Sequence, residues 1–282
     1  MADLAPMIRI AFVGKGGAGK STVAGTFARL LARRGEPVLA LDSDPMPGMP
    51  YSLGVAVDDH PIPEDVVVVG GEGRPRWVLR PGLDAAAMVD RYAAQCPDGV
   101  RYLQFGNLWG PVVRLQQAQF AWSQVVAELD TQQWHLVGDL PGGTRQAMFG
   151  WAKYADTVCL VVEPTVKSLH TAARLASLPR AQWGPRSLIV VVNKARDAAD
   201  ADRVAARLGV EPSAVAPHDP AVLRGDRRGA APLDTAPDGP FAQAVSVLVD
   251  RVVSLYSQPE ESAQPEESAQ SGEAAQREEA AR

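Results

Sequence analysis

Residues 14–21 read Gly-Lys-Gly-Gly-Ala-Gly-Lys-Ser and match the pattern G-x-x-x-x-G-K-[ST] at every fixed position. Glycines at this spacing let the backbone wrap closely around phosphate groups, which its N–H groups then bind. In such a loop Lys20 reaches the β- and γ-phosphates, the Ser21 hydroxyl binds Mg²⁺, and Thr22 donates to the α-phosphate. The predicted nucleotide-binding residues of this loop are Gly14, Lys15, Gly16, Gly17, Ala18, Gly19, Lys20, Ser21 and Thr22.

The segments on either side of this loop are those that such a site requires. Residues 8–13 form a short apolar, β-branched run that predicts a buried strand. Apolar residues at helical spacing follow over residues 20–34, Gly35 is placed to end that helix, and residues 37–41 predict a second strand. We therefore expect a right-handed βαβ unit with the glycine loop between its first strand and its helix.

The rest of the chain repeats this alternation of strands and helices. Buried strands are predicted at residues 134–137, 158–162 and 188–192, and helices at 167–177 and 198–208. Continuous apolar strands separated by helices indicate an α/β fold with a mostly parallel sheet covered by helices on both faces. Residues 55–120 are less regular, and we interpret them as an insertion with a hairpin (66–69 with 77–79) and a helix near 85–95.

The carboxyl-terminal part of the chain changes in composition. A final amphipathic helix is predicted at residues 241–256, so the expected nucleotide-binding domain spans residues 1–256. Residues 257–282 contain QPEESA twice in tandem, with seven glutamates and two arginines, which account for the whole formal net charge of −5. Almost no large apolar side chain occurs there, so we expect a disordered acidic tail.

Bulk composition excludes several classes of protein. Without the tail the chain is near neutral, which argues against a strongly basic nucleic-acid binder. Cys96 and Cys159 are the only cysteines of the chain, and they form no C-x-C or C-x-x-C pair. We therefore expect the protein to reside in a reducing cytoplasm. No apolar run approaches the roughly 18 residues that a membrane helix needs, so no transmembrane segment is predicted.

The additional lysine at position 15 carries a more specific signal. With it the loop reads K-G-G-x-G-K-[ST], and the chain resembles the deviant Walker A family of ATPases, which includes MinD, ParA and the nitrogenase iron protein. The resemblance implies an ATP-dependent face-to-face homodimer in which Lys15 contacts the nucleotide of the twin subunit. A second cation there would stabilise charge on the transferred phosphoryl group. Lys15, Lys20 and Asp44 are the predicted catalytic residues.

Two later segments resemble the switch segments of the same family. Residues 42–45 read Asp-Ser-Asp-Pro and resemble the first switch, which implies that Asp44 positions the attacking water and that Asp42 supports it. Residues 138–143 read Gly-Asp-Leu-Pro-Gly-Gly and resemble the second switch, which implies that Asp139 holds Mg²⁺. The N–H of Gly143 is the candidate sensor of the γ-phosphate.

The base is predicted to be adenine. Asn193 follows a strand in the sequence Asn-Lys-Ala-Arg, and a guanine reader would place an aspartate acceptor where Arg196 stands. Asp197, one residue later, keeps GTP open as an alternative. Asn193 can bond an adenine edge, and residues 217–219, Pro-His-Asp, resemble the adenine-side loop of the family, which implies that Pro217 and Asp219 contact the base. ATP and Mg²⁺ are the expected ligands.

The resemblance covers most of residues 7–237, and the stretches 92–106, 160–175 and 215–232 resemble most the CooC type of carbon monoxide dehydrogenase maturation factor. That branch carries a metal-binding C-x-C pair, whereas residues 106–111 contain no cysteine, which puts nickel insertion in doubt. We expect a switch that acts on an unidentified partner protein. Three alternatives stay open. The first is a ParA- or MinD-like positioning protein, in which Arg224, Arg227 and Arg228 form a small DNA-binding patch. The second is a metallochaperone with non-cysteine ligands, and the third is a small-molecule kinase.

Overall fold

The computed structural model describes residues 6–57, 62, 66–73, 77–105, 112–129, 133–144, 151–177 and 187–258. Within them an eight-stranded sheet has the order β10-β9-β8-β1-β7-β2-β6-β5, and every pairing is parallel except that of β5 with β6. The predicted mostly parallel α/β fold is therefore confirmed. The strands of this sheet are β1 (Arg9–Gly14), β2 (Val38–Asp42), β5 (Ala94–Gln95), β6 (Arg101–Gln104), β7 (His135–Asp139), β8 (Thr157–Val162), β9 (Ser187–Ala195) and β10 (Ala214–Pro217).

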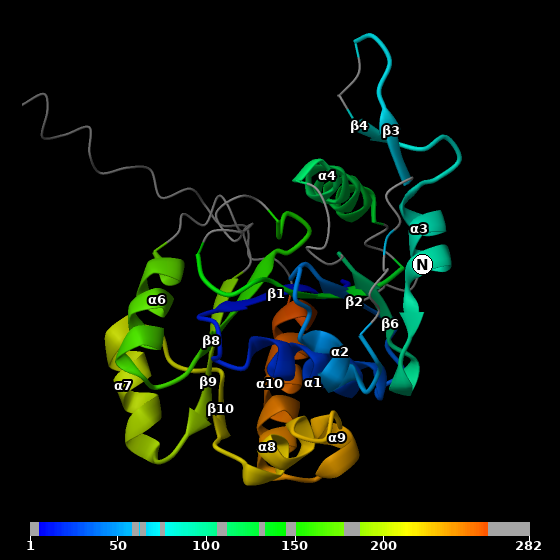
Figure 1. Cartoon of the computed structure of the whole chain (residues 1–282). Helices are drawn as coiled ribbons and strands as arrows, with labels where there is room; N and C mark the ends of the chain where they lie inside the picture. Colours follow the sequence, from blue (N-terminus) through cyan, green and yellow to red (C-terminus); the bar gives the residue numbers. More distant parts are fainter. Residues whose placement is uncertain are drawn as a thin grey trace, which may run out of the picture.

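Helices cover both faces of this sheet (Figure 1). On one face, α1 (Lys20–Ala32), α2 (Met49–Leu53) and α10 (Pro240–Ser257) enclose a core in which the Phe12 and Phe27 rings meet edge to face, 5.5 Å between centroids. On the other face lie α3 (Ala85–Tyr92), α4 (Val112–Glu128), α6 (Val166–Ala176) and α7 (Ala198–Leu208). The short helices α8 (Pro220–Asp226) and α9 (Pro232–Thr235) lie beside α10.

The register of the central strands brings their carboxyl ends together. β1 is paired with β8 on one side and β7 on the other, and β7 is paired in turn with β2. Because these strands run in parallel, the loops that follow β1, β2, β7 and β8 emerge at the same edge of the sheet. Ligands of open α/β sheets bind at that edge.

The region expected to be an insertion is partly regular. The predicted hairpin is confirmed as the antiparallel pair β3 (Val67–Val69) and β4 (Trp77–Leu79). Residues 101–104, however, form β6, a strand of the main sheet beside β2, which the sequence did not predict. The helix α4 was also not predicted. Its Trp122 is buried and packs edge to face on Phe105, 5.9 Å between centroids, because α4 closes the core over this side of the sheet.

The carboxyl-terminal helix α10 extends to Ser257, one residue beyond the predicted end. The repeat tail from residue 259 onward lies outside the described residues, as do residues 106–111. No helix in the part of the chain that the structure describes combines the length and the apolar character needed to cross a membrane.

Candidate functional site

Residues 14–19 form the turn between β1 and α1. Gly14 has φ of 154°, and a side chain there would place Cβ 2.4 Å from the carbonyl oxygen of Val161 on the neighbouring strand. Gly19 has φ of 91°, and its Cβ would lie 2.2 Å from the amide nitrogen of Asn193. At both positions the backbone approaches its neighbour so closely that only glycine fits. Both ends of the predicted phosphate loop are therefore packed tightly against β8 and β9.

The amino terminus of α1 is open for an anion. Gly19 is its N-cap residue, and it supplies no side-chain acceptor to the first turn of the helix. The N–H groups of a first turn have no partner within their own helix, and the helix dipole adds positive potential there. Lys20 is buried at this end, and its charge acts on the Asp139 carboxyl. Positive potential and a cation thus converge where the phosphates are expected.

The loop is held from outside by the end of β9. The Asn193 side-chain amide donates to the Ala18 carbonyl, 2.8 Å, and the Lys194 ammonium donates to the Gly17 carbonyl, 2.6 Å. Asn193 was predicted to contact the base. Its amide nitrogen uses one of its two N–H donors on the loop, so a base contact from Asn193 would use the second N–H or the amide oxygen. Lys194 was not singled out by the sequence pattern.

Two buried carboxyl groups lie beneath the loop. Asp42 and Asp139 end the neighbouring strands β2 and β7 and are paired in register. Asp42 accepts from the backbone N–H of Asp44 at 2.9 Å and of Met49 at 3.2 Å. Burial, the Asp139 charge and the Asp44 charge hold the pKa of Asp42 well above its ordinary value, against those two hydrogen bonds. Asp42 thus organises the turn after β2, which fits the supporting role implied for it.

Asp139 has the properties of a magnesium-binding carboxylate. Burial raises its pKa to about 6, although the Lys20 charge and a hydrogen bond with Ser21 lower it. Its Oδ1 is buried without a hydrogen-bond partner in the structure. A buried carboxylate oxygen left without a donor is costly, and a hard cation or its water shell would satisfy it. The Ser21 hydroxyl and the Asp139 carboxylate therefore fit Mg²⁺.

The two predicted switch segments flank the loop. Asp44 is half-buried, and its carboxylate accepts from the Met46 N–H at 2.9 Å. The Gly143 N–H donates to the Gly14 carbonyl at 2.9 Å. A Cβ on Gly142 would lie 2.8 Å from the Cα of Gly16, so the second switch touches the phosphate loop. If Gly143 senses the γ-phosphate, this hydrogen bond to Gly14 must break first.

A cleft of about 530 Å³ extends from the phosphate loop to α8, α9 and α10. Pro217, at the end of β10, and Asp219, the residues expected to contact the base, both line it. Asp219 also caps α8 by accepting from the Ala221 N–H at 2.8 Å. Two exposed apolar residues, Tyr51 and Leu223, line it as well, and no sequence motif pointed to them. The cleft combines phosphate-binding groups with apolar walls suited to a base.

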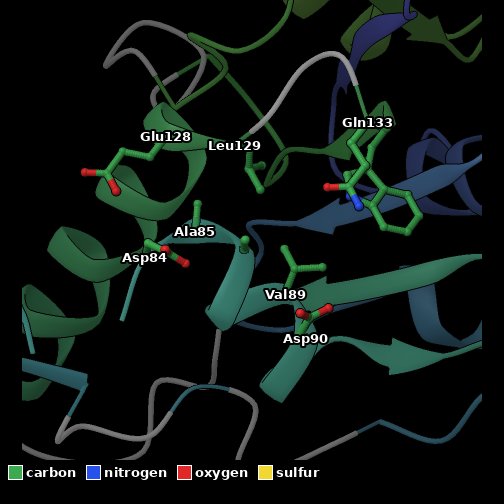
Figure 2. Close-up of a pocket in the computed structure, with 9 residues that line it drawn as sticks. Asp84, Ala85, Val89, Asp90, Glu128, Leu129 and Gln133 are labelled. Atoms are coloured by element: carbon green, nitrogen blue, oxygen red, sulfur yellow. The ribbon is translucent and has the colours of Figure 1, made fainter. Parts of the chain in front are cut away.

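A second cavity of about 240 Å³ lies away from these residues, between α3 and the end of α4 (Figure 2). Three carboxylates line it, and one of them, Asp84, caps α3 by accepting from the Ala87 N–H at 2.8 Å. None of the predicted site residues lines this cavity. Among the described residues no group of three or more His, Cys, Asp or Glu side chains is arranged to hold a metal ion.

The three arginines of the possible DNA-binding patch lie close together in the chain. Arg224, Arg227 and Arg228 are exposed on α8 and the turn after it, so the DNA-patch hypothesis stays a prediction.

Burial raises the pKa of the Cys96 thiol to about 11, despite the nearby Arg29 charge, and holds that of Cys159 well above its ordinary value. Neither thiol is therefore set up as a thiolate metal ligand.

The fold and the loop together define the class: a parallel sheet with a glycine loop between its central strand and the following helix is the P-loop NTPase fold of MinD and ParA. Residues 10–233 match the CobQ/CobB/MinD/ParA nucleotide binding domain, and the chain belongs to that family. The match includes the phosphate loop, both predicted switches and the base-side loop.

Similar proteins agree with this assignment. The carbon monoxide dehydrogenase accessory protein CooC of Rhodospirillum rubrum is 26% identical over 245 residues, which cover 82% of this chain and 91% of CooC. An uncharacterised ATP-binding protein of Methanocaldococcus jannaschii is 26% identical over 234 residues, 79% of this chain and 90% of that protein.

Solved structures of the same fold include two proteins with low sequence identity. The septum site-determining protein MinD from Pyrococcus horikoshii, complexed with Mg-ADP, superimposes with a TM-score of 0.66 at 22% identity. The match covers 86% of this chain and 94% of the MinD chain. A ParA family ATPase from Chlorobium tepidum superimposes with a TM-score of 0.65 at 19% identity. The match covers 87% of this chain and 98% of that ATPase. At these identities the likeness concerns the fold alone.

Proposed function

We propose that this protein is a Mg-ATP-dependent homodimeric switch with slow ATPase activity that acts on a partner protein. The observation that carries the proposal is Lys15, a second lysine at the mouth of a complete phosphate loop. In the structure its ammonium group donates to the Gly16 carbonyl of its own loop at 3.2 Å, on the exposed side of the turn. Lys20 already supplies the cation within the site, so Lys15 is available to a neighbouring subunit.

Two exposed apolar residues at the same edge of the sheet as the phosphate loop support an association of two copies. Met46, after β2, is 80% exposed, and Val166, at the start of α6 after β8, is 84% exposed. Both follow the carboxyl ends of strands at the edge of the sheet where the phosphate loop lies. Burying these side chains against a second copy would remove their apolar surface from water, which is favourable. We expect these two residues to be covered when the ATP-bound dimer forms.

Within one subunit the residues have separate tasks. The loop N–H groups and Lys20 hold the triphosphate, Ser21 and Asp139 hold Mg²⁺, which neutralises phosphate charge when bound, and Asp44 orients the attacking water. Lys15 from the twin stabilises the charge that develops on the transferred phosphoryl group. Gly143 couples the γ-phosphate to the shape of the second switch. Hydrolysis then removes the group that holds the two subunits together.

Light scattering with purified protein tests the oligomeric part of this proposal. The Asp44→Ala variant removes the residue that positions water, so it should accumulate as a dimer with Mg-ATP and stay monomeric with Mg-ADP. The Lys15→Ala/Asp44→Ala double variant should stay monomeric with both nucleotides while it still binds ATP. An Asp44→Ala chain that binds Mg-ATP and remains monomeric would falsify the switch.

A second candidate is a metallocentre-maturation chaperone with non-cysteine ligands, which the likeness to CooC favours. This function would add a metal site to the same ATP-dependent dimer. Equilibrium dialysis of the dimeric Asp44→Ala variant against nickel or zinc, in the presence of Mg-ATP, tests it. One transition-metal ion per dimer would support this candidate, and the absence of stoichiometric metal would remove it.

A further inference from the structure

We propose that Lys194 is a positioning residue for the phosphate loop, and that its ammonium group fixes the turn that carries Lys15. The inference deepens the function proposed above and rests on it. Lys194 Nζ lies 2.6 Å from the Gly17 carbonyl oxygen and 3.9 Å from a carboxylate oxygen of Glu163, which follows β8. A hydrogen bond from a charged donor at this distance is among the strong ones. Neither Lys194 nor Glu163 belongs to the recognised phosphate-loop motif.

The backbone directs Lys194 toward the loop at an energetic cost. Ala216 of β10 pairs with Asn193, and the next residue, Pro217, pairs with Ala195, so Lys194 is the extra residue of a β-bulge. Its φ is 61°, in the left-handed region that a residue with a side chain rarely adopts. Bulges beside functional sites redirect side chains, and strained residues concentrate at such sites. The conformation is explained if the ammonium group must reach the Gly17 carbonyl.

The contact has a defined effect on the loop. In a trans peptide the carbonyl and the next N–H point in opposite directions. Lys194 therefore fixes the peptide between Gly17 and Ala18, and the Ala18 N–H on its other side donates to the Lys15 carbonyl at 3.1 Å. That second hydrogen bond closes the tight turn from Lys15 to Ala18. Asn193 acts in the same way on the next peptide, through the Ala18 carbonyl at 2.8 Å.

The choice of lysine is itself informative in this chain. Only five of its 28 Lys and Arg residues are lysines. Three of the five, Lys15, Lys20 and Lys194, lie in or contact the phosphate loop. An ammonium group is a compact point charge that can enter a narrow turn and bond a single carbonyl, whereas a guanidinium is a wide, planar fork. The use of lysine at position 194 therefore fits a contact with one carbonyl oxygen.

Paired substitutions separate the ammonium group from the backbone. Lys194→Gly and Lys194→Ala both remove the ammonium, but glycine accepts a positive φ without strain and alanine does not. Both variants should bind Mg-ATP and Mg-tripolyphosphate about tenfold more weakly than the wild type, because a charged hydrogen bond to the loop is lost. Lys194→Gly should melt at a higher temperature than Lys194→Ala. The exposed Lys167 on α6 provides the control, and Lys167→Ala should bind both ligands like the wild type.

Isothermal titration with both ligands gives the decisive comparison. Equal losses for ATP and tripolyphosphate support a role in shaping the phosphate loop. A loss confined to ATP would show that Lys194 contacts the nucleoside, and wild-type affinity in Lys194→Gly would show that the contact is dispensable; either result overturns the inference. The proposed switch fails separately if the wild type binds both ligands tightly but the Asp44→Ala variant forms no dimer with Mg-ATP. A wild type that binds neither ligand overturns both proposals.

Discussion

Asp42 and Asp139 lie side by side in register on the parallel strands β2 and β7, and both carboxyl groups are buried beneath the phosphate loop. Burial raises the pKa of each, and the charge of Asp139 adds to the rise at Asp42. Two adjacent buried carboxyl groups cannot both ionise at low cost. This pair therefore disfavours the nucleotide-free protein at neutral pH and favours the binding of a cation.

The stability of the nucleotide-free protein should consequently fall as pH rises. The pKa of Asp139 is about 6 in the fold and near 3.8 when unfolded, so the folded state holds an additional proton between these values. The stabilisation by this proton is complete below about pH 4 and is lost as pH rises through about 6. The free energy of unfolding should fall by about 2–3 kcal/mol over this range. Urea denaturation from pH 4 to pH 8 measures this change.

The Asp139→Asn variant tests the origin of that pH dependence. An amide of the same shape has no charge to bury, so the variant should show a flatter profile and, without nucleotide, greater stability than the wild type near pH 8. It should also lose most of the increase in ATP affinity that Mg²⁺ provides. If the variant retains the full pH slope, Asp139 is not its source; Asp42→Asn then identifies the contribution of the neighbouring carboxyl.

A methyl group at position 142 should separate the second switch from the phosphate loop. In Gly142→Ala the new Cβ would meet the Cα and N of Gly16 at 2.8 and 2.9 Å, and these are backbone atoms that cannot rotate away. We expect at least a tenfold loss of Mg-ATP affinity, with 1–3 kcal/mol of lost stability at most, since overpacking costs about that much. Calorimetric titration and thermal melting measure the two effects.

Gly82 provides the matched control. It has φ of 83° and open space where a Cβ would be, away from the predicted site. Gly82→Ala should cost about 1 kcal/mol of stability through backbone strain and leave ATP affinity unchanged. If both glycine variants bind ATP like the wild type, the contact between switch and loop has no role in binding.

The buried Arg29 should stabilise the fold far more than a surface arginine. Its guanidinium, 3% exposed, bonds Asp98 at 2.7 Å and Asp234 at 2.8 Å, which connects α1 to the turn at residues 97–99 and to α9. We expect Arg29→Met to lower the free energy of unfolding by about 2–4 kcal/mol, because two charged hydrogen bonds are lost from a buried site. Denaturant titration measures the loss.

Arg34 pairs with Asp250 at 2.8 Å, but both side chains are substantially exposed. Arg34→Met should therefore cost less than about 1 kcal/mol, as is typical of surface ion pairs. Similar losses for the two methionine variants would contradict the structural role given to the Arg29 network.

The central βαβ unit and the phosphate loop were predictable because their signals are local. The β1 run, the glycine spacing and the periodicity of α1 are all contained within residues 8–34, and the structure agrees with them to within two residues. The alternation of later strands and helices was predictable for the same reason. Asp42 and Asp139 follow such strands, so their convergence at one edge followed from parallel pairing.

The features that the sequence did not predict depend on tertiary contacts. The strand β6 has the sequence Arg-Tyr-Leu-Gln, too mixed to suggest a buried strand, and it is fixed by pairing with β2. The direction of Lys194 comes from a bulge set by pairing with β10. Tyr51 and Leu223 line the cleft only because α2 and α8 are folded toward it. No local pattern carries this information.

Complementation between two inactive variants tests the central claim most directly. Lys15→Ala lacks the proposed donor, and Asp44→Ala lacks the residue that positions water, so each should hydrolyse ATP poorly alone. A mixed dimer contains one complete site, formed by Asp44 of the first variant and Lys15 of the second. An equimolar mixture should recover activity up to roughly a quarter of the wild-type value, which is the limit for random pairing, since half of such dimers are mixed and each has one competent site. Weaker pairing through a single Lys15 lowers the recovery below this limit. A mixture no more active than its separate components would contradict the proposal that Lys15 acts across the dimer.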